Sequence, residues 1–209
     1  MKKLLNFIKE IIIKIKNKKY PNIHKTSSVA FSAKIYNADN LYLAERTNIS
    51  ANSVIMNTRA KFIMKKYSGA AFGLTVITGG HISVPGKSHK HITNKIKDEI
   101  DFNHEEDLDV VVDEDVWIGA RSMLLRGVHL GRGSIVGAGS VVRKSVPPYA
   151  IVTGNPAKIV GFRFTPQEMV VHEAALMPED QRLPFETLQK NYEKYYVQRI
   201  KEIRNFIKL

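Results

Sequence analysis

A six-residue repeat constrains the fold of this chain more than any other feature of its sequence. From residue 112 the sequence divides without a gap into VDEDVW, IGARSM, LLRGVH, LGRGSI, VGAGSV and VRKSVP. The first position is always aliphatic, and the fifth is always Val or Ser. A helix would repeat every 3.6 residues and an ordinary strand every two, so neither produces this pattern. A period of six instead predicts short strands joined by tight corners, with the aliphatic residue inside each coil.

The repeat extends over much of the chain in a less regular form. Gly occupies the second position in three of the six units, where we expect it to permit the turn. Five earlier aliphatic residues follow the same spacing with one two-residue slip: Val29, Ile35, Leu43, Ile49 and Ile55. Residues 61–80 are expected to form further coils. Because one coil cannot bury its own face, the coils must stack. The sequence therefore predicts a solenoid domain over residues 21–163.

The repeat is interrupted once, directly after His81. Residues 82–111 are polar and charged, and Val112 restores the spacing. So long an excursion inside a compact domain is usually either a functional loop or a disordered one. We therefore expect the chemistry of the chain near this interruption.

Residues 164–209 are predicted to form a helical extension. An apolar face begins near residue 186, and acidic and basic residues balance over the segment; the apolar residues are Leu188, Tyr192, Tyr195, Tyr196, Ile203 and Ile207. This pattern favours helices that pack on the solenoid over helices that bind a ligand.

Residues 1–20 are predicted to form a basic amphipathic helix. The formal net charge of the chain is +12, and residues 1–19 hold seven lysines against Glu10. Two interpretations stay open: a helix packed on the protein or a neighbouring subunit, and a helix resting on an anionic membrane. No uncharged stretch reaches the roughly 20 residues that would span a bilayer, and no signal-peptide pattern is visible.

Composition excludes several other classes. The positive charge is concentrated at the N-terminus instead of being spread over a folded face, which argues against a nucleic-acid-binding protein. The sequence has no cysteine, so disulfides and cysteine metal sites are excluded and a reducing compartment is permitted. We expect a cytoplasmic protein, peripheral to the inner membrane face if residues 1–19 bind lipid.

The sequence VWIGARSMLLRGVHLGRGSIVGAGSVVRKSVPPYAIVTGNPAKIV, at residues 116–160, resembles hexapeptide-repeat acyltransferases. These include galactoside and maltose acetyltransferases, hexapeptide-type xenobiotic acetyltransferases, and sugar or capsular polysaccharide O-acetyltransferases. The resemblance covers roughly residues 29–163. It implies an all-β core, a left-handed parallel β-helix, a homotrimer with active sites between subunits, and acetyl-CoA as co-substrate without a metal.

The sequence LTVITGGHISV, at residues 74–84, is similar to the family segment that carries the catalytic histidine. The resemblance implies that His81 is a general base, which takes a proton from the acceptor without a covalent intermediate. The unperturbed pKa of histidine lies near operating pH, which suits this role. His89, His91 and His104 are expected to be solvated loop residues, and His129 a structural one.

Several residues match the coenzyme-contact positions of the family. Trp117 resembles the family Trp beside the pantetheine arm, and small residues there let the arm lie against the coil. Lys144 and Lys158 resemble the phosphate contacts, whereas Arg143 stands where the family often has Thr and is either a further phosphate contact or a solvated residue. The full candidate set is Trp117, Gly119, Ala120, Ala138, Arg143, Lys144 and Lys158. A further basic residue of the family is replaced by Gly161, for which Arg163 is a candidate substitute.

The acceptor side carries less sequence information. The family often places an Asn or Asp on an early coil, for which Asn52 is preferred over Asn57. An Asn at a corner equally suits a turn.

The resemblance thus implies an acetyl-CoA-dependent acetyltransferase that modifies a hydroxyl of a sugar or polysaccharide precursor. The alternative is an N-acetyltransferase that acts on an amino sugar or an antibiotic, because both acceptors need the same base. A zinc hydratase would need further histidines on the coil walls, and a non-catalytic binding module would not depend on His81.

Overall fold

The computed structural model describes residues 19–207 of the chain. Residues 1–18 and 208–209 lie outside the described part, so the predicted basic helix over residues 1–20 and its membrane contact through residues 1–19 fall almost wholly outside it.

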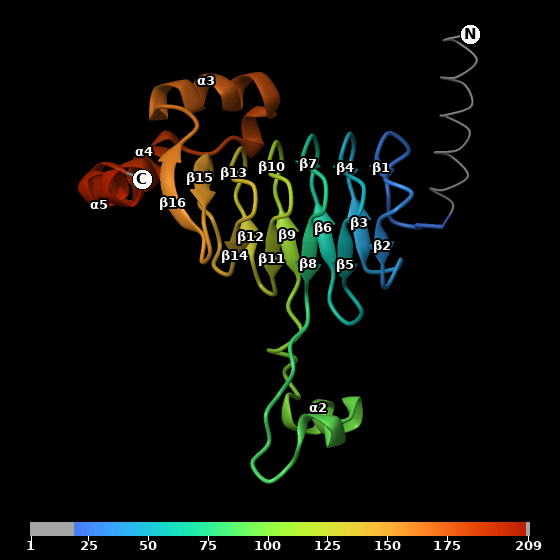
Figure 1. Ribbon diagram of the computed structural model, residues 1–209. Coiled ribbons are helices and arrows are strands. Elements are labelled where there is room, and N and C mark those ends of the chain that lie inside the picture. The colour runs from blue at the N-terminus through green and yellow to red at the C-terminus, as the bar shows by residue number, and fades with distance from the viewer. Residues whose placement is uncertain (1–18, 208–209) are drawn as a thin grey trace.

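Short strands form three sheets along the solenoid (Figure 1). The first contains β1 (Ser28–Val29), β4 (Asn48–Ile49), β7 (Gly69–Ala70), β10 (Trp117–Ile118), β13 (Ile135–Val136), β15 (Ala150–Thr153) and β16 (Lys158–Phe162). The second contains β2 (Lys34–Ile35), β5 (Val54–Met56), β8 (Thr75–Ile77), β11 (Met123–Leu125) and β14 (Val141–Val142). The third contains β3 (Leu41–Leu43), β6 (Phe62–Met64), β9 (Val110–Val112) and β12 (His129–Leu130).

Each of the four turns from β1 to β12 adds one strand to each sheet, and in the next turn only an isolated bridge between Leu130 and Val146 continues the third sheet. Strand β10, for example, pairs in parallel with β7 on one side and β13 on the other, so that Ile118 lies beside Ala70 and Val136. The predicted parallel β-helix is confirmed. Among the strands of residues 19–207, only β16 runs antiparallel, against β15, and it ends the stack of parallel coils.

The six-residue spacing places the same side chains inside every coil. The first-position residues are each at most 1% exposed: Val112, Ile118, Leu124, Leu130, Val136 and Val142. The fifth-position residues are buried too, and two serines there donate to corner carbonyls, from Ser122 to Gly119 at 2.8 Å and from Ser140 to Gly137 at 2.6 Å. The interior position of the repeat is confirmed, and its aliphatic side chains supply the hydrophobic driving force of the fold.

The second-position glycines have a different role from the predicted one. Left-handed backbone occurs at the fourth position of the units, as at Gly127 and Gly133 with φ of 73° and 68°. At the second position the constraint is space, because a Cβ on Gly131 would lie 2.6 Å from the backbone nitrogen of Pro148 in the next coil. These glycines therefore permit close stacking of coils, and the fourth position makes the turn.

The interruption after His81 is an ordered excursion that projects away from the stacked sheets (Figure 1). It contains η1 (His89–His91) and α2 (Asn94–Ile100), and the side chain of Thr93 caps α2 by accepting from the backbone N–H of Ile96. Strand β9 begins at Val110, two residues before the predicted return.

The C-terminal segment forms helices at the end of the solenoid next to β16 (Figure 1), as predicted. They are α3 (Pro166–Leu176), η2 (Glu179–Gln181), α4 (Phe185–Tyr195), η3 (Val197–Arg199) and α5 (Ile200–Ile207). Helix α3 begins with a capping box in which Thr165 and Glu168 satisfy each other's backbone N–H groups. Buried Met169 and Leu188 pack with Tyr149, which joins the helices to the coils. None of the helices within residues 19–207 is long and apolar enough to cross a membrane.

Candidate active site

His81 is exposed at the root of the projecting loop, four residues after β8 ends. The outgoing and returning segments of the loop bind each other there. Gly80 donates its backbone N–H to the carbonyl of Glu106 at 2.6 Å, and Leu108 donates to Thr78 at 2.9 Å. The position of His81 is therefore set by a short pairing of two segments that are distant in sequence.

The His81 cleft is a hollow of about 230 Å³ at this root. Three parts of the chain line it: the corner after β5, the end of β8 with the residues that follow, and the loop. The lining residues are Met56, Thr58, Arg59, Ile77, Gly79, Gly80, His81, Asn94, Lys97 and Asp107.

An ion cluster forms one wall of the His81 cleft. The Nζ of Lys97 lies 2.7 Å from Oδ1 of Asp107, and the Nε of Arg59 lies 2.7 Å from Oδ2 of the same carboxylate. Lys97 is only 7% exposed. Arg59 also bonds Asp98 of α2, and this hydrogen bond, together with Asp107, raises the pKa of Arg59 above its ordinary value. The sequence does not single out these four residues, because nothing in their spacing indicates that they meet.

Four of the other histidines lie where the sequence predicted them. His89, His91 and His104 are exposed on the loop, although His89 and Lys90 border a second hollow beside His81. His129 lies on the third sheet, where its Nε2 is 2.7 Å from Oδ2 of Asp113.

The residues predicted to hold the thiol arm follow the first sheet and its corner. Trp117 is 51% exposed on β10, and its ring lies over the backbone of Gly69 on β7. Gly119 is buried at the following corner, with Ala120 half-buried beside it and Ala138 exposed on the next coil. A Cβ on Gly119 would lie 2.6 Å from the backbone nitrogen of Ala138, so the two corners are in close contact.

Two of the predicted phosphate contacts share another hollow, the terminal cleft, of about 430 Å³. Lys144 and Lys158 line it together with the C-terminal helices; the full lining is Val142, Lys144, Ser145, Val146, Val152, Ala157, Lys158, Ile159, Tyr195 and Arg199. Arg143 is exposed and is not among these residues. Arg163 lies elsewhere, since its Nη1 is 2.6 Å from Oδ2 of Asp115.

The two candidate acceptor residues both serve corners. Asn52 is exposed with a left-handed φ of 56°, and its backbone N–H donates to Ser32 Oγ at 3.0 Å. Asn57 is fully buried and bonds the backbone of Asn37 through both ends of its amide, at 2.7 and 3.1 Å. Neither residue lines the His81 cleft.

Within one chain, the predicted residues therefore fall into three groups. His81 lies in a cleft at one corner, Trp117 with Gly119 and Ala138 lies along the first sheet and its corner, and Lys144 with Lys158 lies in the terminal cleft. Among residues 19–207 no three His, Asp or Glu side chains gather as a metal site would need.

Comparison with known proteins identifies the repeat. Residues 109–144 match the family model for the bacterial transferase hexapeptide (six repeats). A chloramphenicol acetyltransferase of Klebsiella aerogenes is 49% identical over 59 residues, which are 28% of this chain and 28% of that protein. A probable macrolide acetyltransferase of Lysinibacillus sphaericus is 37% identical over 109 residues, which are 52% of this chain and 56% of that protein. The chain thus matches less than two thirds of the length of these relatives.

Solved structures share the fold. A hexapeptide-repeat-containing acetyltransferase from Vibrio cholerae, complexed with acetyl-coenzyme A, aligns with a TM-score of 0.58 at 21% identity, over 73% of this chain and 76% of that one. A maltose O-acetyltransferase from Clostridium difficile aligns with a TM-score of 0.57 at 20% identity, over 73% and 74%. The chain therefore carries the hexapeptide repeat of bacterial transferases, and it is similar in sequence to antibiotic acetyltransferases and in fold to hexapeptide-repeat acetyltransferases.

Proposed function

We propose that the protein transfers an acetyl group from acetyl-CoA to a hydroxyl of a sugar or polysaccharide precursor, with His81 as the general base. One observation carries the proposal: an exposed histidine lies in a polar cleft at the single interruption of a repeat that acetyltransferases share. Sequence relatives named as acetyltransferases support the reaction class.

His81 performs the proton transfers of this reaction. Acetyl-CoA supplies the acetyl group as an activated thioester. A ring nitrogen of His81 takes the proton of the acceptor hydroxyl while the oxygen attacks the thioester carbon. As the carbon–sulfur bond breaks, the imidazolium of His81 returns that proton to the departing sulfur. A base positioned in this way typically contributes about 10²–10⁴-fold in rate.

The residues along the coils fit an extended coenzyme. No bulky side chain projects from the corner at Gly119, Ala120 and Ala138, so an extended thiol arm can lie close to the backbone there. The exposed ring of Trp117 offers an apolar surface on the adjacent strand. Arg143 and the two lysines of the terminal cleft, Lys144 and Lys158, provide positive charge for phosphates. We assign these seven residues to coenzyme binding.

The separation of the groups supports a homotrimer with active sites between subunits. His81 follows a strand of the second sheet, whereas Trp117 belongs to the first. The two faces that carry His81 and Trp117 cannot meet within one chain. The His81 face of one subunit can, however, lie against the Trp117 face of a neighbouring subunit. In this arrangement Asn52 would contact the acceptor from an early coil. The resemblance implies left-handed winding, which stays a prediction.

The polar lining of the His81 cleft favours a polyhydroxylated acceptor. Asn94, Thr58 and Arg59 offer hydrogen bonds, and only Met56 and Ile77 are apolar side chains among the lining residues. The second candidate is N-acetylation of an amino sugar or an antibiotic, and the sequence identity to chloramphenicol and macrolide acetyltransferases favours an antibiotic as acceptor.

We also propose a cytoplasmic location, with contact to the inner membrane face through residues 1–19. The seven lysines of that segment would suit a precursor held at an anionic surface.

An acceptor screen tests the proposed function. The wild type is incubated with acetyl-CoA and mono- and oligosaccharides, chloramphenicol or a macrolide, and free thiol release is followed. His81→Ala should lower turnover about 10²–10⁴-fold, whereas His89→Ala, which removes an exposed histidine from the same loop, should not. Mass spectrometry and alkaline hydrolysis of the product separate esters from amides. Equal rates for wild type and His81→Ala would refute the assignment of the base.

A further inference from the structure

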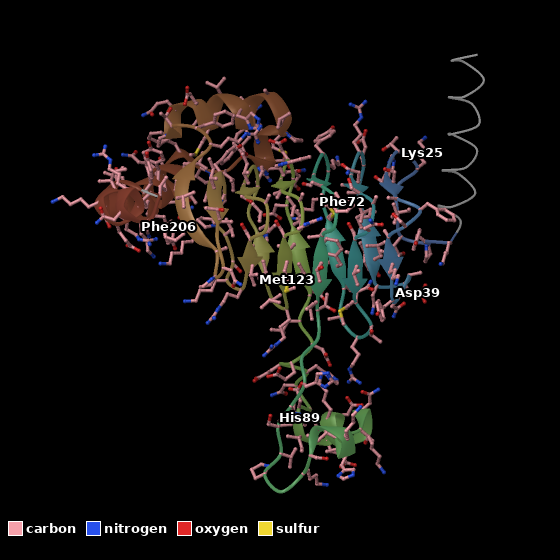
Figure 2. All side chains as sticks on the ribbon, viewed as in Figure 1. Lys25, Asp39, Phe72, His89, Met123 and Phe206 are labelled. Carbon is pink, nitrogen blue, oxygen red and sulfur yellow. The ribbon has the colours of Figure 1, made fainter. Side chains whose placement is uncertain are left out.

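The terminal cleft is formed jointly by the last coils and the C-terminal helices. Lys144 follows β14 and Lys158 begins β16, while Tyr195 ends α4 and Arg199 ends η3. Figure 2 shows Phe206 of α5 at this helical end of the solenoid, with His89 on the projecting loop away from it. The helical extension thus does more than cover the coils, because it supplies two lining residues, Tyr195 and Arg199, of a hollow that also contains two predicted phosphate contacts.

The charges of the terminal cleft are unbalanced. The Nε and Nη2 of Arg199 bond both carboxylate oxygens of Glu202, at 2.9 and 2.7 Å. The hydrogen bond from Arg199 and, more weakly, the charge of Lys158 lower the pKa of Glu202. Within residues 19–207, the lining of the terminal cleft thus holds three cations, Lys144, Lys158 and Arg199, and no carboxylate, and the side chains of the Arg199–Glu202 pair are 33% and 58% exposed. An exposed ion pair contributes little to stability, so a stronger anion can replace Glu202 on the guanidinium.

Arg199 can replace a basic residue that the resemblance leads us to expect and that the sequence lacks. The family's further basic position is Gly161 here, and the candidate substitute Arg163 is engaged by Asp115 at 2.6 Å. Arg199 provides a third cation beside Lys144 and Lys158, although it comes from the helical extension.

We infer that Arg199 and Tyr195 complete the nucleotide end of the coenzyme site. This inference rests on the proposed use of acetyl-CoA. Arg199, with Lys144 and Lys158, binds the 3′-phosphate of the coenzyme, and the ring of Tyr195 packs against the adenine.

The chemistry of the two groups fits these roles. A phosphomonoester carries about −1.5 to −2 charges at pH 7, which matches the excess of cations in the terminal cleft. The planar fork of arginine binds two phosphate oxygens at once, as it now binds two oxygens of Glu202. Aromatic side chains stack on nucleobases, and Tyr195 lines the terminal cleft together with Val142, Val146 and Val152.

Calorimetric binding of coenzyme A and 3′-dephospho-coenzyme A tests this inference. The wild type should bind coenzyme A at least about tenfold more tightly than the dephospho form, which is the discrimination of one lost bidentate contact. Arg199→Met should abolish most of this preference while its affinity for the dephospho form stays near that of the wild type. Tyr195→Ala should weaken binding of both forms and leave acetyl-pantetheine unaffected.

Two matched variants separate binding from folding. Arg204→Met removes an equal charge from α5 outside the terminal cleft and should keep the preference. Glu202→Gln breaks the same ion pair as Arg199→Met but should retain or strengthen coenzyme binding, so loss of the pair alone would not mimic the effect.

If wild type binds neither form, the proposed function fails and this inference with it. If the wild type prefers coenzyme A and Arg199→Met keeps that preference, only this inference is overturned.

Discussion

Lys97 donates a hydrogen bond of 2.8 Å from its Nζ to the carbonyl oxygen of Gly80, the residue directly before His81. The same ammonium is paired with Asp107 at 2.7 Å, and it is almost fully buried. A side chain of the projecting loop therefore fixes the backbone that carries the candidate base. Lys97 does not need to touch a substrate to influence the reaction, so we treat it as a positioning residue.

Replacing Lys97 with Met should lower kcat on the order of 10²-fold with little change in the KM for acetyl-CoA, because small misplacements of a catalytic group can cost that much. The removed ammonium holds the Gly80 carbonyl, and no predicted coenzyme contact is disturbed. Steady-state kinetics on the acceptor found by screening measure both parameters, and Lys97→Arg should restore part of kcat.

Lys95→Met is the matched control, since Lys95 is exposed on the same helix. It should leave kcat unchanged. A Lys97→Met protein with wild-type kcat would show that the Gly80 contact does not position His81, and intact coenzyme A binding by the variant would show that it is folded.

The interior of the coils predicts a clear contrast between adjacent residues of β11. Leu124 is fully buried at the first position of its repeat, whereas Met123 beside it is only partly buried. Leu124→Ala should lower the free energy of unfolding by about 2–5 kcal/mol, and Met123→Ala by clearly less. Denaturant titration followed by circular dichroism measures both. Equal losses would contradict the assignment of the first position to the core.

The repeat was predictable because its cause is local. Each first-position aliphatic residue enters the coil interior wherever the six-residue spacing holds, so the sequence alone locates Ile118, Leu124 and Leu130 in the core. The spacing also located the interruption after His81. The six-residue pattern could not distinguish a glycine needed for left-handed backbone from a glycine needed for close stacking, because both requirements select the same residue.

The walls of the two clefts could not be predicted, because their residues come from segments that only the fold brings together. Arg59 lies at a corner one coil before His81, and Lys97 and Asp107 lie on the loop. Arg199 lies in a helical segment of balanced charge, which gave no reason to expect a ligand. Contacts of this kind depend on how the loop and the helices fold back, and no period in the sequence encodes that.

Gly131 tests the close stacking of coils. A Cβ there would lie 2.6 Å from the backbone nitrogen of Pro148 and 2.9 Å from the carbonyl oxygen of Val146. Because backbone atoms cannot move aside cheaply, Gly131→Ala should destabilise the protein by about 1–3 kcal/mol. Gly161→Ala is the control, since no atom lies within 4 Å of a Cβ at that position. Thermal unfolding measures both, and a neutral Gly131→Ala would mean that the coils can separate at this corner.

Tyr149 connects the coils to α3 through a buried hydrogen bond. Its hydroxyl donates to Oε1 of Glu173 at 2.7 Å, and Arg132 lies 2.6 Å from Oε2 of the same carboxylate. Tyr149→Phe leaves one carboxylate oxygen without its donor. At pH 7 it should therefore lower the free energy of unfolding by about 1–3 kcal/mol. Tyr36→Phe, which changes a largely exposed tyrosine, should have no such effect.

The same contact predicts a dependence of stability on alkaline pH. Burial first, and then the hydrogen bond to Glu173, raise the pKa of Tyr149 well above its ordinary value. In the unfolded chain this phenol ionises near pH 10, whereas in the folded protein it keeps its proton. The folded state then binds more protons than the unfolded state, so stability is complete below about pH 10 and falls as the pH rises beyond it. The slope from one such group approaches about 1.4 kcal/mol per pH unit.

Urea titrations between about pH 8 and 11 should therefore show a steeper loss for the wild type and Tyr36→Phe than for Tyr149→Phe. Parallel curves for wild type and Tyr149→Phe would mean that the Tyr149 phenol ionises equally in the folded and unfolded states. The hydrogen bond to Glu173 would then not retain the proton of the Tyr149 hydroxyl.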